Sequence, residues 1–551
     1  MKNTWTPYAD LVIQNGQIYT VDLTVQEVQA GKDTFAVYPN GFVAAKGGKT
    51  IGAGEGSGDT FIGPDTKVID AGGATVIPGL IDSHMHAMFS GVELLGINFE
   101  GCADLAEFKR RLSERAKSTP KGEWIKGAGW NEMVWPDKKM PTRKDLDEAA
   151  PDHPLYCIRL CHHVYAANSK ALELAGVTRD TPDPEGGKIG RDETGEPNGL
   201  FYENSAMGII DEAVPPLTEE QLIQAIESIG RVMNGFGLTS CIDANMTFDQ
   251  MRAYLQAKKQ GRLTYRENIM FYLDKAWGDM PYHLNRLREM MAVTGFGDDM
   301  VKLNGIKVTL DGIPATGTAA MRQPYDHMPE TSGDIIYTRE QMLELGALAG
   351  KYRWQIGLHC CGDRSADVAM DTFEAAYAAA GNQDARHYII HMAITQPDQV
   401  SRLRELNVPI TVQPTINLQM GEQSVIGERL SARYMMFGTA FSNGIIVGGS
   451  SDCPVVTCNP FEGMYGAISR NTVCGFAHLP QEALTARQAL IMWTKNSAYF
   501  SHDDDQMGSI TVGNLADYVI IDTPLLEASP EEIRRTKVLK TILGGKVVFE
   551  R

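Results

Sequence analysis

The sequence of 551 residues contains no apolar run of about 18 residues, the length that a helix needs to cross a bilayer. Residues 1–5 lead directly into polar positions, without the apolar stretch of a secretory signal. We therefore expect a cytoplasmic protein with no membrane partner.

Positive charge is also scarce. The chain carries 51 Lys and Arg against 69 Asp and Glu, so its formal net charge is −18. Proteins that bind nucleic acid or anionic membrane surfaces present clusters of basic residues. This acidic balance argues against both kinds of partner and leaves a small molecule as the expected one.

Paired Cys-x2-Cys motifs, the signature of a structural zinc site, are missing as well. The nine cysteines are scattered through the chain, and an odd number in a long sequence predicts free thiols in a reducing compartment. The hydrophobic fraction of 43% is typical of a globular protein, and the length suggests two lobes or one large domain with an appendage.

Short β segments with glycine-rich turns occur at both ends of the chain. Residues 9–22 predict a hairpin that turns at Asn15-Gly16, and residues 538–550 predict one that turns at Gly544-Gly545. Because neither end can bury a core alone, we expect one composite β-sandwich from residues 1–77 and 495–551.

Between these ends, apolar strands alternate with helical segments, which is typical of a parallel α/β fold. The strands approach the eight of a (β/α)8 TIM barrel, which we place at residues 78–494. Such a barrel needs about 250 residues. The surplus predicts an inserted subdomain, which we place at about 95–230 because that stretch is rich in charge, proline and glycine.

Two histidines follow the first strand of the expected barrel. His84 and His86 are separated by one residue, and on an extended strand such residues share a face. Two neutral imidazoles on one face can hold a divalent cation. The alternative is that both histidines simply face solvent on an edge strand.

Four more polar residues each close an apolar strand or directly follow one, where a barrel places its active site. Taken singly, a histidine there could be structural, the lysine could pair with Asp311, and the aspartate could be a turn residue. Together with the His84 and His86 pair they predict a metal centre. Imidazole and carboxylate ligands suit zinc, manganese, iron or cobalt. The four residues are Lys307, His359, His391 and Asp452.

This ordered set resembles the amidohydrolase superfamily, specifically the YtcJ-like branch of amidohydrolase family 3. Further stretches along nearly the whole chain look like the motifs of that branch. Cys161-His162 and Ile390-His391 depart from its usual pattern. The matching stretches are Gly-Trp-Asn-Glu-Met-Val-Trp-Pro (129–136), Pro-Thr-Arg-Lys-Asp-Leu-Asp (141–147), His-Val-Tyr-Ala-Ala-Asn-Ser (163–169), and residues 195–203, 307–312, 359–364 and 508–517.

The resemblance implies a metal-dependent hydrolase with one or two metal ions per chain, zinc before others. It implies that His84 and His86 hold one ion with Asp452, that His359 and His391 hold the second, and that a carboxylated Lys307 bridges them. A metal-bound hydroxide would attack, with Asp452 as general base and then acid. If Lys307 is unmodified, the expected site is mononuclear, and His391 is then an acid/base or a substrate contact.

Motif positions also suggest contacts with the substrate. By that criterion we name Trp130, His163, Glu203 and Arg322. Trp130 is equally compatible with the core of the insertion, and His163 with a structural role. The family further implies a homodimer.

Three functions are compatible with these observations. The first is hydrolysis of an amide, N-acyl or N-formyl C–N bond in a small organic molecule. The second is deamination of a cyclic amidine or aminoheterocycle at a mononuclear site. The third is a non-catalytic binding relative, which would be expected to lose metal ligands, whereas all six positions here hold residues competent to bind a metal.

Overall fold

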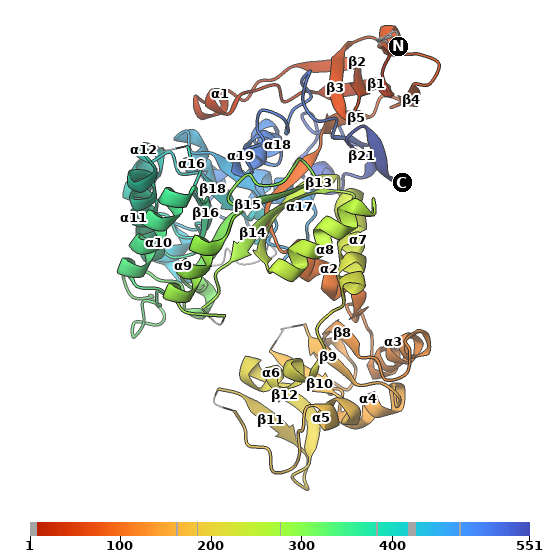
Figure 1. Cartoon of the computed structure of the whole chain (residues 1–551), viewed down its shortest axis with the longest axis vertical. Coiled ribbons are helices and arrows are strands. Elements are labelled where there is room, and N and C mark those ends of the chain that lie inside the picture. The colour runs from red at the N-terminus through yellow and green to blue at the C-terminus, as the bar shows by residue number, and fades with distance from the viewer. Residues whose placement is uncertain are drawn as a thin grey trace. The chain divides into compact units, whose positions relative to one another are not determined.

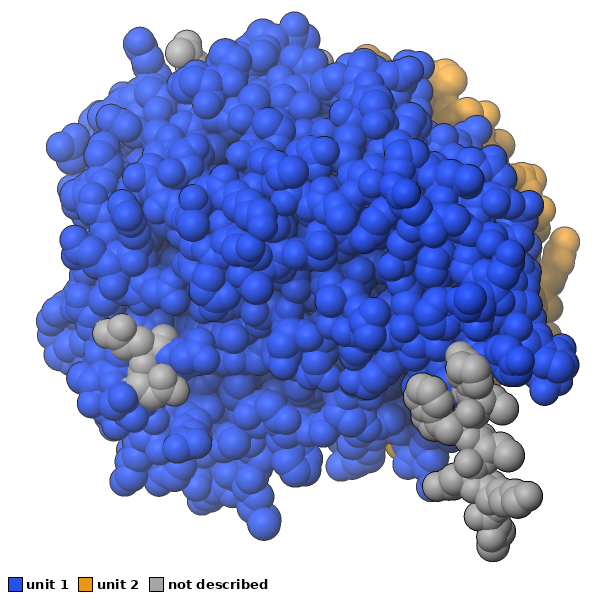
Figure 2. Space-filling view, turned by 90° about the horizontal axis from the view of Figure 1, so that it is seen from above, with its two compact units in different colours: residues 1–87, 230–551 blue, residues 88–229 orange. Residues whose placement is uncertain are grey.

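The structure is a computed structural model that describes residues 8–160, 163–184, 186–275, 277–381, 384–416, 426–472 and 475–551. The chain forms two compact units, which Figure 2 shows in two colours. The first comprises residues 1–87 and 230–551, and the second comprises residues 88–229. No helix within the described ranges combines the length and the apolar character needed to cross a membrane.

Eight parallel strands of the first unit form a nearly closed barrel and follow one another in chain order (Figure 1). This confirms the predicted α/β fold with a TIM barrel. Neighbouring parallel strands need long crossover connections, which helices supply here. The strands are β6 (Leu80–Met85), β13 (Leu238–Met246), β14 (Arg266–Tyr272), β15 (Val301–Thr309), β16 (Ile356–Cys360), β17 (Tyr388–His391), β18 (Ile410–Val412) and β19 (Val447–Gly449). Helices α8 (Phe248–Lys259), α9 (Met280–Glu289), α10 (Arg339–Tyr352), α11 (Asp363–Ala380) and α12 (Pro397–Glu405) connect them.

The segment after β19 bonds to the end of β6 and brings the two edges of the barrel together. The amide of Asp452 donates to the carbonyl of His84, and the amide of His86 donates to the carbonyl of Cys453, both at 2.9 Å. The Ser451 hydroxyl donates to the Asp82 carboxylate at 2.6 Å. These bonds fix Asp452 beside His84 of β6 and His86, which follows the strand.

Both ends of the chain contribute to one antiparallel-rich sheet, in which the strands of the N-terminus and the C-terminus lie together (Figure 1). The predicted hairpin at Gly544-Gly545 is confirmed, since Leu543 pairs with Lys546. The predicted domain boundaries stay predictions. The order is β22 (Lys546–Glu550), β21 (Val538–Leu543), β20 (Tyr518–Ile521), β5 (Thr75–Pro78), β1 (Leu11–Tyr19), β2 (Val37–Lys46) and β3 (Lys49–Glu55), with β4 (Lys67–Asp70) also on β1.

The predicted hairpin at Asn15-Gly16 is wrong, because β1 runs through this dipeptide without turning. Asn15 has a φ of 56°, and the pairing of β1 with β2 shifts register between Ile13 and Gly16. The dipeptide therefore makes a bulge rather than a turn. β4 pairs with the first half of β1 and β5 with the second half, so tertiary pairing holds the strand extended.

A buried ion pair joins the barrel to this sheet. Arg266, in β14, is 3% exposed and donates from Nε and Nη2 to the two carboxylate oxygens of Asp517, at 2.7 and 2.9 Å. Asp517 also accepts from the amide of Gly544 at 2.7 Å. This two-point contact fixes the C-terminal strands against the base of β14.

The second unit has its own six-stranded sheet and its own core, which includes the buried side chains Trp130 and Trp135. The sheet order is β11 (Lys188–Arg191), β12 (Pro197–Tyr202), β10 (Val164–Ala167), β9 (Leu155–Arg159), β8 (Ile125–Trp130) and β7 (Ile97–Asn98). Its helices are α3 (Leu105–Ser118), α4 (Arg143–Ala149), α5 (Ser169–Leu174) and α6 (Glu203–Ala213), while α2 (Ala87–Leu95) and α7 (Glu219–Gly235) cross its limits. The first unit also contains α1 (Val25–Gln29), α15 (Glu428–Ser431), α16 (Phe437–Ser442), α17 (Pro460–Ser469), α18 (Ala486–Met492), α19 (Lys495–Phe500) and α20 (Pro530–Arg534).

Candidate metal centre

One cavity of about 280 Å³ lies at the carboxyl ends of the barrel strands. All six residues that the sequence singled out as metal ligands line it. They come from β6, β15, β16, β17 and the segment after β19, so the barrel brings together residues up to several hundred positions apart. The six are His84, His86, Lys307, His359, His391 and Asp452.

Asp452 lies beside both His84, in β6, and His86, directly after that strand. Its Oδ1 is 3.2 Å from Nε2 of His84 and 3.2 Å from Nε2 of His86. His84, His391 and Asp452 are all buried, and each offers a ligand atom within 4.8 Å of the other two. Three nitrogen and oxygen ligands this close could hold a single cation.

His391 is held in place by a glutamine from the next strand. Its Nδ1 donates to Oε1 of Gln413 at 2.8 Å, and Nε2 of Gln413 donates to the hydroxyl of Ser450 at 2.8 Å. The second bond fixes the orientation of the amide, so its oxygen faces the imidazole. His391 therefore keeps Nε2 for the cavity, as a second hydrogen bond commonly arranges for metal-binding histidines.

Asp311 holds the imidazole of His359 in place in the same way. Its carboxylate lies 3.3 Å from Nδ1 of His359 and accepts from the amides of Cys361 and Gly362 at 3.0 and 2.8 Å. The Ser365 hydroxyl donates to it at 2.6 Å. Within the described part of the chain, Asp311 thus binds the loop after β16 rather than Lys307.

Lys307 is almost fully buried beside these groups, with 4% of its surface exposed. Burial lowers the pKa of its ammonium to about 8, against the opposing attraction of Asp452. The neutral amine is consequently more populated than in an exposed lysine. A neutral amine is the form that can react with CO2.

The residues present fit a divalent cation. Burial lowers the pKa of His391 to about 3 and that of His84 well below its usual value, so both imidazoles are in the neutral, ligating form. Nδ1 of His84 is buried and has no hydrogen-bond partner among the described residues. A buried ring nitrogen without a partner is costly unless something binds it.

The four residues named as substrate contacts do not belong to the described lining of this cavity. Trp130 is fully buried in the second unit and donates to Glu132 at 3.1 Å. His163 and Glu203 pair at 2.8 Å on the surface of that unit. Arg322 pairs with Asp367 and Asp398 at 2.6 and 2.8 Å. Their contact with substrate stays a prediction, and Cys161-His162 lies outside the described residues.

Sequence reasoning missed five residues that line the cavity, Ala244, Asn245, Tyr272, Thr309 and Val455. Asn245 lies near the end of β13 and Tyr272 ends β14, so the rule that found His359 and His391 would have found them too. The same rule points to Gln413, directly after β18. Tyr272 and Thr309 are joined by a hydrogen bond of 3.0 Å between their hydroxyls.

Known proteins resemble the chain along nearly all its length. It is 26% identical to the Bacillus subtilis (strain 168) protein YtcJ, over 97% of this chain and 98% of that protein. It is 27% identical to an N-substituted formamide deformylase of Arthrobacter pascens, over 99% of both. The crystal structure of an uncharacterized metal-dependent hydrolase from Pyrococcus horikoshii OT3 shares the fold, with a TM-score of 0.76 and 24% identity over 95% of this chain and 99% of that one.

The model of the amidohydrolase family matches residues 67–549. That range includes the barrel, its six cavity-lining candidates and the strands β4, β5, β20 and β21 of the sheet formed by the termini. The family predicted from the ordered histidines, lysine and aspartate is therefore confirmed. This chain belongs to the amidohydrolase family.

Proposed function

We propose that this protein is a metal-dependent hydrolase that cleaves the C–N bond of an amide, N-acyl or N-formyl group in a small organic molecule. The observation that carries the proposal is the buried cluster of His84, His391 and Asp452, whose ligand atoms lie within 4.8 Å of one another in a cavity open to a ligand. The name of the Arthrobacter pascens relative, an N-substituted formamide deformylase, supports the choice of bond.

His84, His86, His359, His391 and Asp452 would hold the metal, with Lys307 as a further ligand if it is carboxylated. A bound divalent cation lowers the pKa of a water molecule and polarises a carbonyl group. Zinc suits this set of nitrogen and oxygen ligands, as do manganese, iron and cobalt. Gln413 and Asp311 hold His391 and His359 in the orientation that presents their free nitrogens.

Asp452 would accept the proton of the attacking water and return it to the leaving nitrogen. Burial alone raises the pKa of this carboxyl, but the hydrogen bonds from His84 and His86 outweigh burial and hold the pKa well below its usual value. Asp452 is consequently ionised and able to accept a proton. Its contacts with His84 and His86 keep it in the lining of the cavity.

The cavity favours a small substrate. Its volume of about 280 Å³ lies at the lower end of the range for small-molecule sites. Asn245, Tyr272 and Thr309 add polar contacts and Val455 an apolar one, so they are the first candidates for orienting the substrate. A cytoplasmic location and a homodimer are predictions from the sequence and from the family.

The metal content per chain tests this proposal, measured by elemental analysis on protein purified without chelator. Intact mass under non-denaturing conditions is measured alongside. Two metal ions and the added mass of one CO2 support the bridged site with carboxylated Lys307. One ion without added mass supports the mononuclear site and favours the alternative function, deamination. No metal, and none taken up from zinc or manganese, contradicts the proposal.

A further inference from the structure

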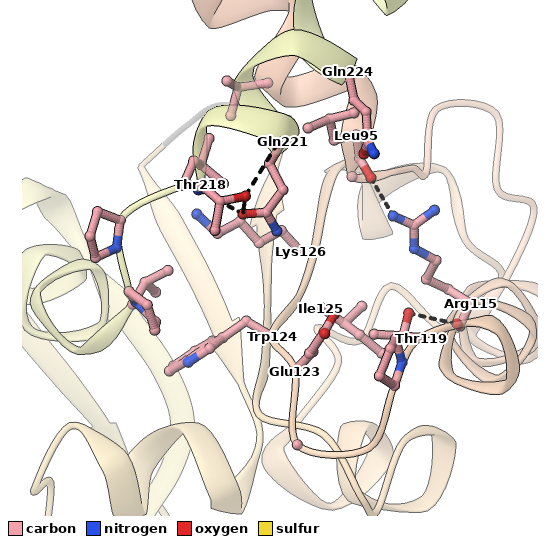
Figure 3. Close-up of a pocket in the computed structure, with 18 of the residues that line it drawn as sticks. Leu95, Arg115, Thr119, Glu123, Trp124, Ile125, Lys126, Thr218, Gln221 and Gln224 are labelled. Carbon is pink, nitrogen blue, oxygen red and sulfur yellow. Dashed lines mark hydrogen bonds between the residues drawn. The ribbon is translucent and has the colours of Figure 1, made fainter. Parts of the chain in front are cut away.

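A second, larger cavity lies within the unit of residues 88–229, and Figure 3 shows its lining. Its volume is about 740 Å³, inside the range of about 300–1,000 Å³ that small-molecule sites occupy. The start of β8, the loop before it and the residues leading into α7 contribute most of the lining. Every lining residue belongs to this one unit.

Aromatic and apolar side chains make one wall of this cavity. Trp124 packs edge-on against Tyr156, with ring centroids 6.2 Å apart, and is only partly buried. Pro215 and Pro216 also line the cavity and are exposed. A partly exposed indole beside two prolines offers a flat apolar surface to a ring.

Lys126 places a positive charge next to that wall. It follows Trp124 by two residues, and both side chains lie against the ring of Tyr156. Its Nζ lies 5.5 Å from the centroid of the Tyr156 ring, and no ion pair to it is found within the described part of the chain. Burial lowers its pKa, against the opposing attraction of Asp211, so the ammonium lacks full compensation.

Further hydrogen-bond donors line the same cavity. Arg115 uses Nη2 to bond the carbonyl of Leu95 at 2.7 Å, which fixes its guanidinium at the rim. Gln221 accepts the amide of Thr218 through Oε1 at 2.9 Å, so its amide nitrogen is left for another partner (Figure 3). Among the described lining residues, two are basic and one, Glu123, is acidic. The lining therefore carries a net positive charge.

We propose that this cavity binds a small organic anion with a flat apolar body, an aromatic or heteroaromatic carboxylate. The carboxylate lies against Lys126, and the ring lies against Trp124 and the two prolines. A carboxylate there compensates the desolvated ammonium, which a neutral molecule of the same shape does not do. The site belongs to the second unit alone and is separate from the metal centre of the barrel.

Isothermal titration of the full-length protein with 2-naphthoate and with its neutral isostere 2-naphthamide tests the proposal. The expected result is one naphthoate per chain, bound at least about tenfold more tightly than the amide, which corresponds to about 1.4 kcal/mol. Equal binding of acid and amide, or no saturable binding of the acid, would overturn the proposal.

Substitutions of Lys126 test whether the anion binds at this residue. Lys126→Gln is expected to abolish the preference for the acid, whereas Lys126→Arg keeps the charge and is expected to retain it. Lys144→Gln removes an exposed lysine of the same unit that does not line the cavity, and serves as the matched control. A preference that persists in Lys126→Gln overturns the proposal, because the anion then binds elsewhere, such as at the metal centre.

A further variant covers the case in which Lys126→Gln does not fold. Trp124→Leu is expected to weaken the acid and the amide by the same factor, several-fold, because both stack on the indole. Unchanged binding of both ligands in this variant contradicts the placement of the ring. Circular dichroism of each variant shows whether the fold is kept.

Discussion

The metal-centre cavity of the barrel and the Glu132 cluster of residues 88–229 both bury charged or ionisable side chains, but these side chains differ in how many hydrogen-bond partners they have. In the barrel, Nδ1 of His84 has no partner among the described residues, and Lys307 is buried at the cost of a lowered pKa. In the second unit, Glu132 is 2% exposed yet receives hydrogen bonds from Nε of Arg159, at 2.9 and 3.1 Å, and from Nη2 of Arg159, at 2.8 Å. Trp130 adds a fourth at 3.1 Å.

This difference distinguishes a buried polar group that serves function from one that serves the fold. A buried polar group that neighbours satisfy contributes to a specific fold, whereas one left unsatisfied reduces stability and indicates a ligand. By this criterion we expect the cavity of the barrel to bind a ligand, as proposed above, and the Glu132 cluster to be part of a core. Substitutions in the two places should therefore affect different quantities.

The largest effect is expected for Asp452→Asn. Loss of the carboxylate that accepts and returns the proton should lower kcat/KM about 1,000-fold, within the range of general acid–base catalysis. The free energy of unfolding should fall by no more than about 2 kcal/mol, because asparagine keeps the size of the side chain and its amide oxygen can still accept a bond from one of the two histidines. Steady-state kinetics on an N-formyl or N-acyl substrate, with chemical denaturation, measure both quantities.

Asp65→Asn is the matched control, since Asp65 is exposed in the loop before β4. It should leave both quantities unchanged. If Asp452→Asn keeps more than a tenth of the wild-type kcat/KM, Asp452 is not the proton carrier. A large loss of stability in that variant would instead make Asp452 a structural residue and remove the contrast with Glu132.

The second effect is on stability. Glu132→Gln should lower the free energy of unfolding of the second unit by about 2 kcal/mol, because hydrogen bonds between charged partners contribute about 1.5–3 kcal/mol. Glu148→Gln, which removes an exposed partner of Lys109, should cost less than about 0.5 kcal/mol. Urea denaturation measures both. Equal effects in the two variants would contradict the structural role of the buried pair.

The effect of Glu132→Gln should also depend on pH. Burial alone raises the pKa of Glu132, and the bonds from Arg159 outweigh it, so the pKa in the folded protein is lowered. The stabilisation is therefore fully present above the pKa of the unfolded chain and is lost as the pH falls through the lower, folded value. The wild type should approach the variant in acid, which urea denaturation at a series of pH values will show.

The smallest effect is expected for His163→Ala. The side chains of His163 and Glu203 are 61% and 56% exposed, and an exposed ion pair contributes less than about 0.5 kcal/mol. A similarly small change in kcat/KM would make the pair a surface feature of the second unit. A KM raised more than tenfold, with unfolding unchanged, would support the predicted contact with substrate.

Most of the barrel could be predicted because its strands are short apolar runs that end in polar residues. The predicted strands at 355–359 and 388–391 lie within one residue of β16 and β17. Asn245 and Tyr272 were missed although they lie at strand ends of the same kind. A neutral asparagine or tyrosine at a strand end does not indicate a metal site as a histidine does, although the barrel brings all of these side chains to the same cavity.

The Asn15-Gly16 prediction failed for a physical reason that one sequence cannot reveal. The dipeptide favours positive φ, and Asn15 does adopt it, but the same backbone angle suits a bulge as well as a turn. Pairing with β4 and β5, which follow 50 or more residues later, kept the strand extended.

The sequence by itself determined the order of strands, the residue types at their ends and hence the family, because periodicity and polar strand ends are local properties of the chain. Only the tertiary structure decided which polar groups are satisfied. It joined His359 to Asp311 and His391 to Gln413, and it left Nδ1 of His84 without a described partner. Those outcomes depend on closing the barrel between β6 and Asp452, where residues more than 360 positions apart meet.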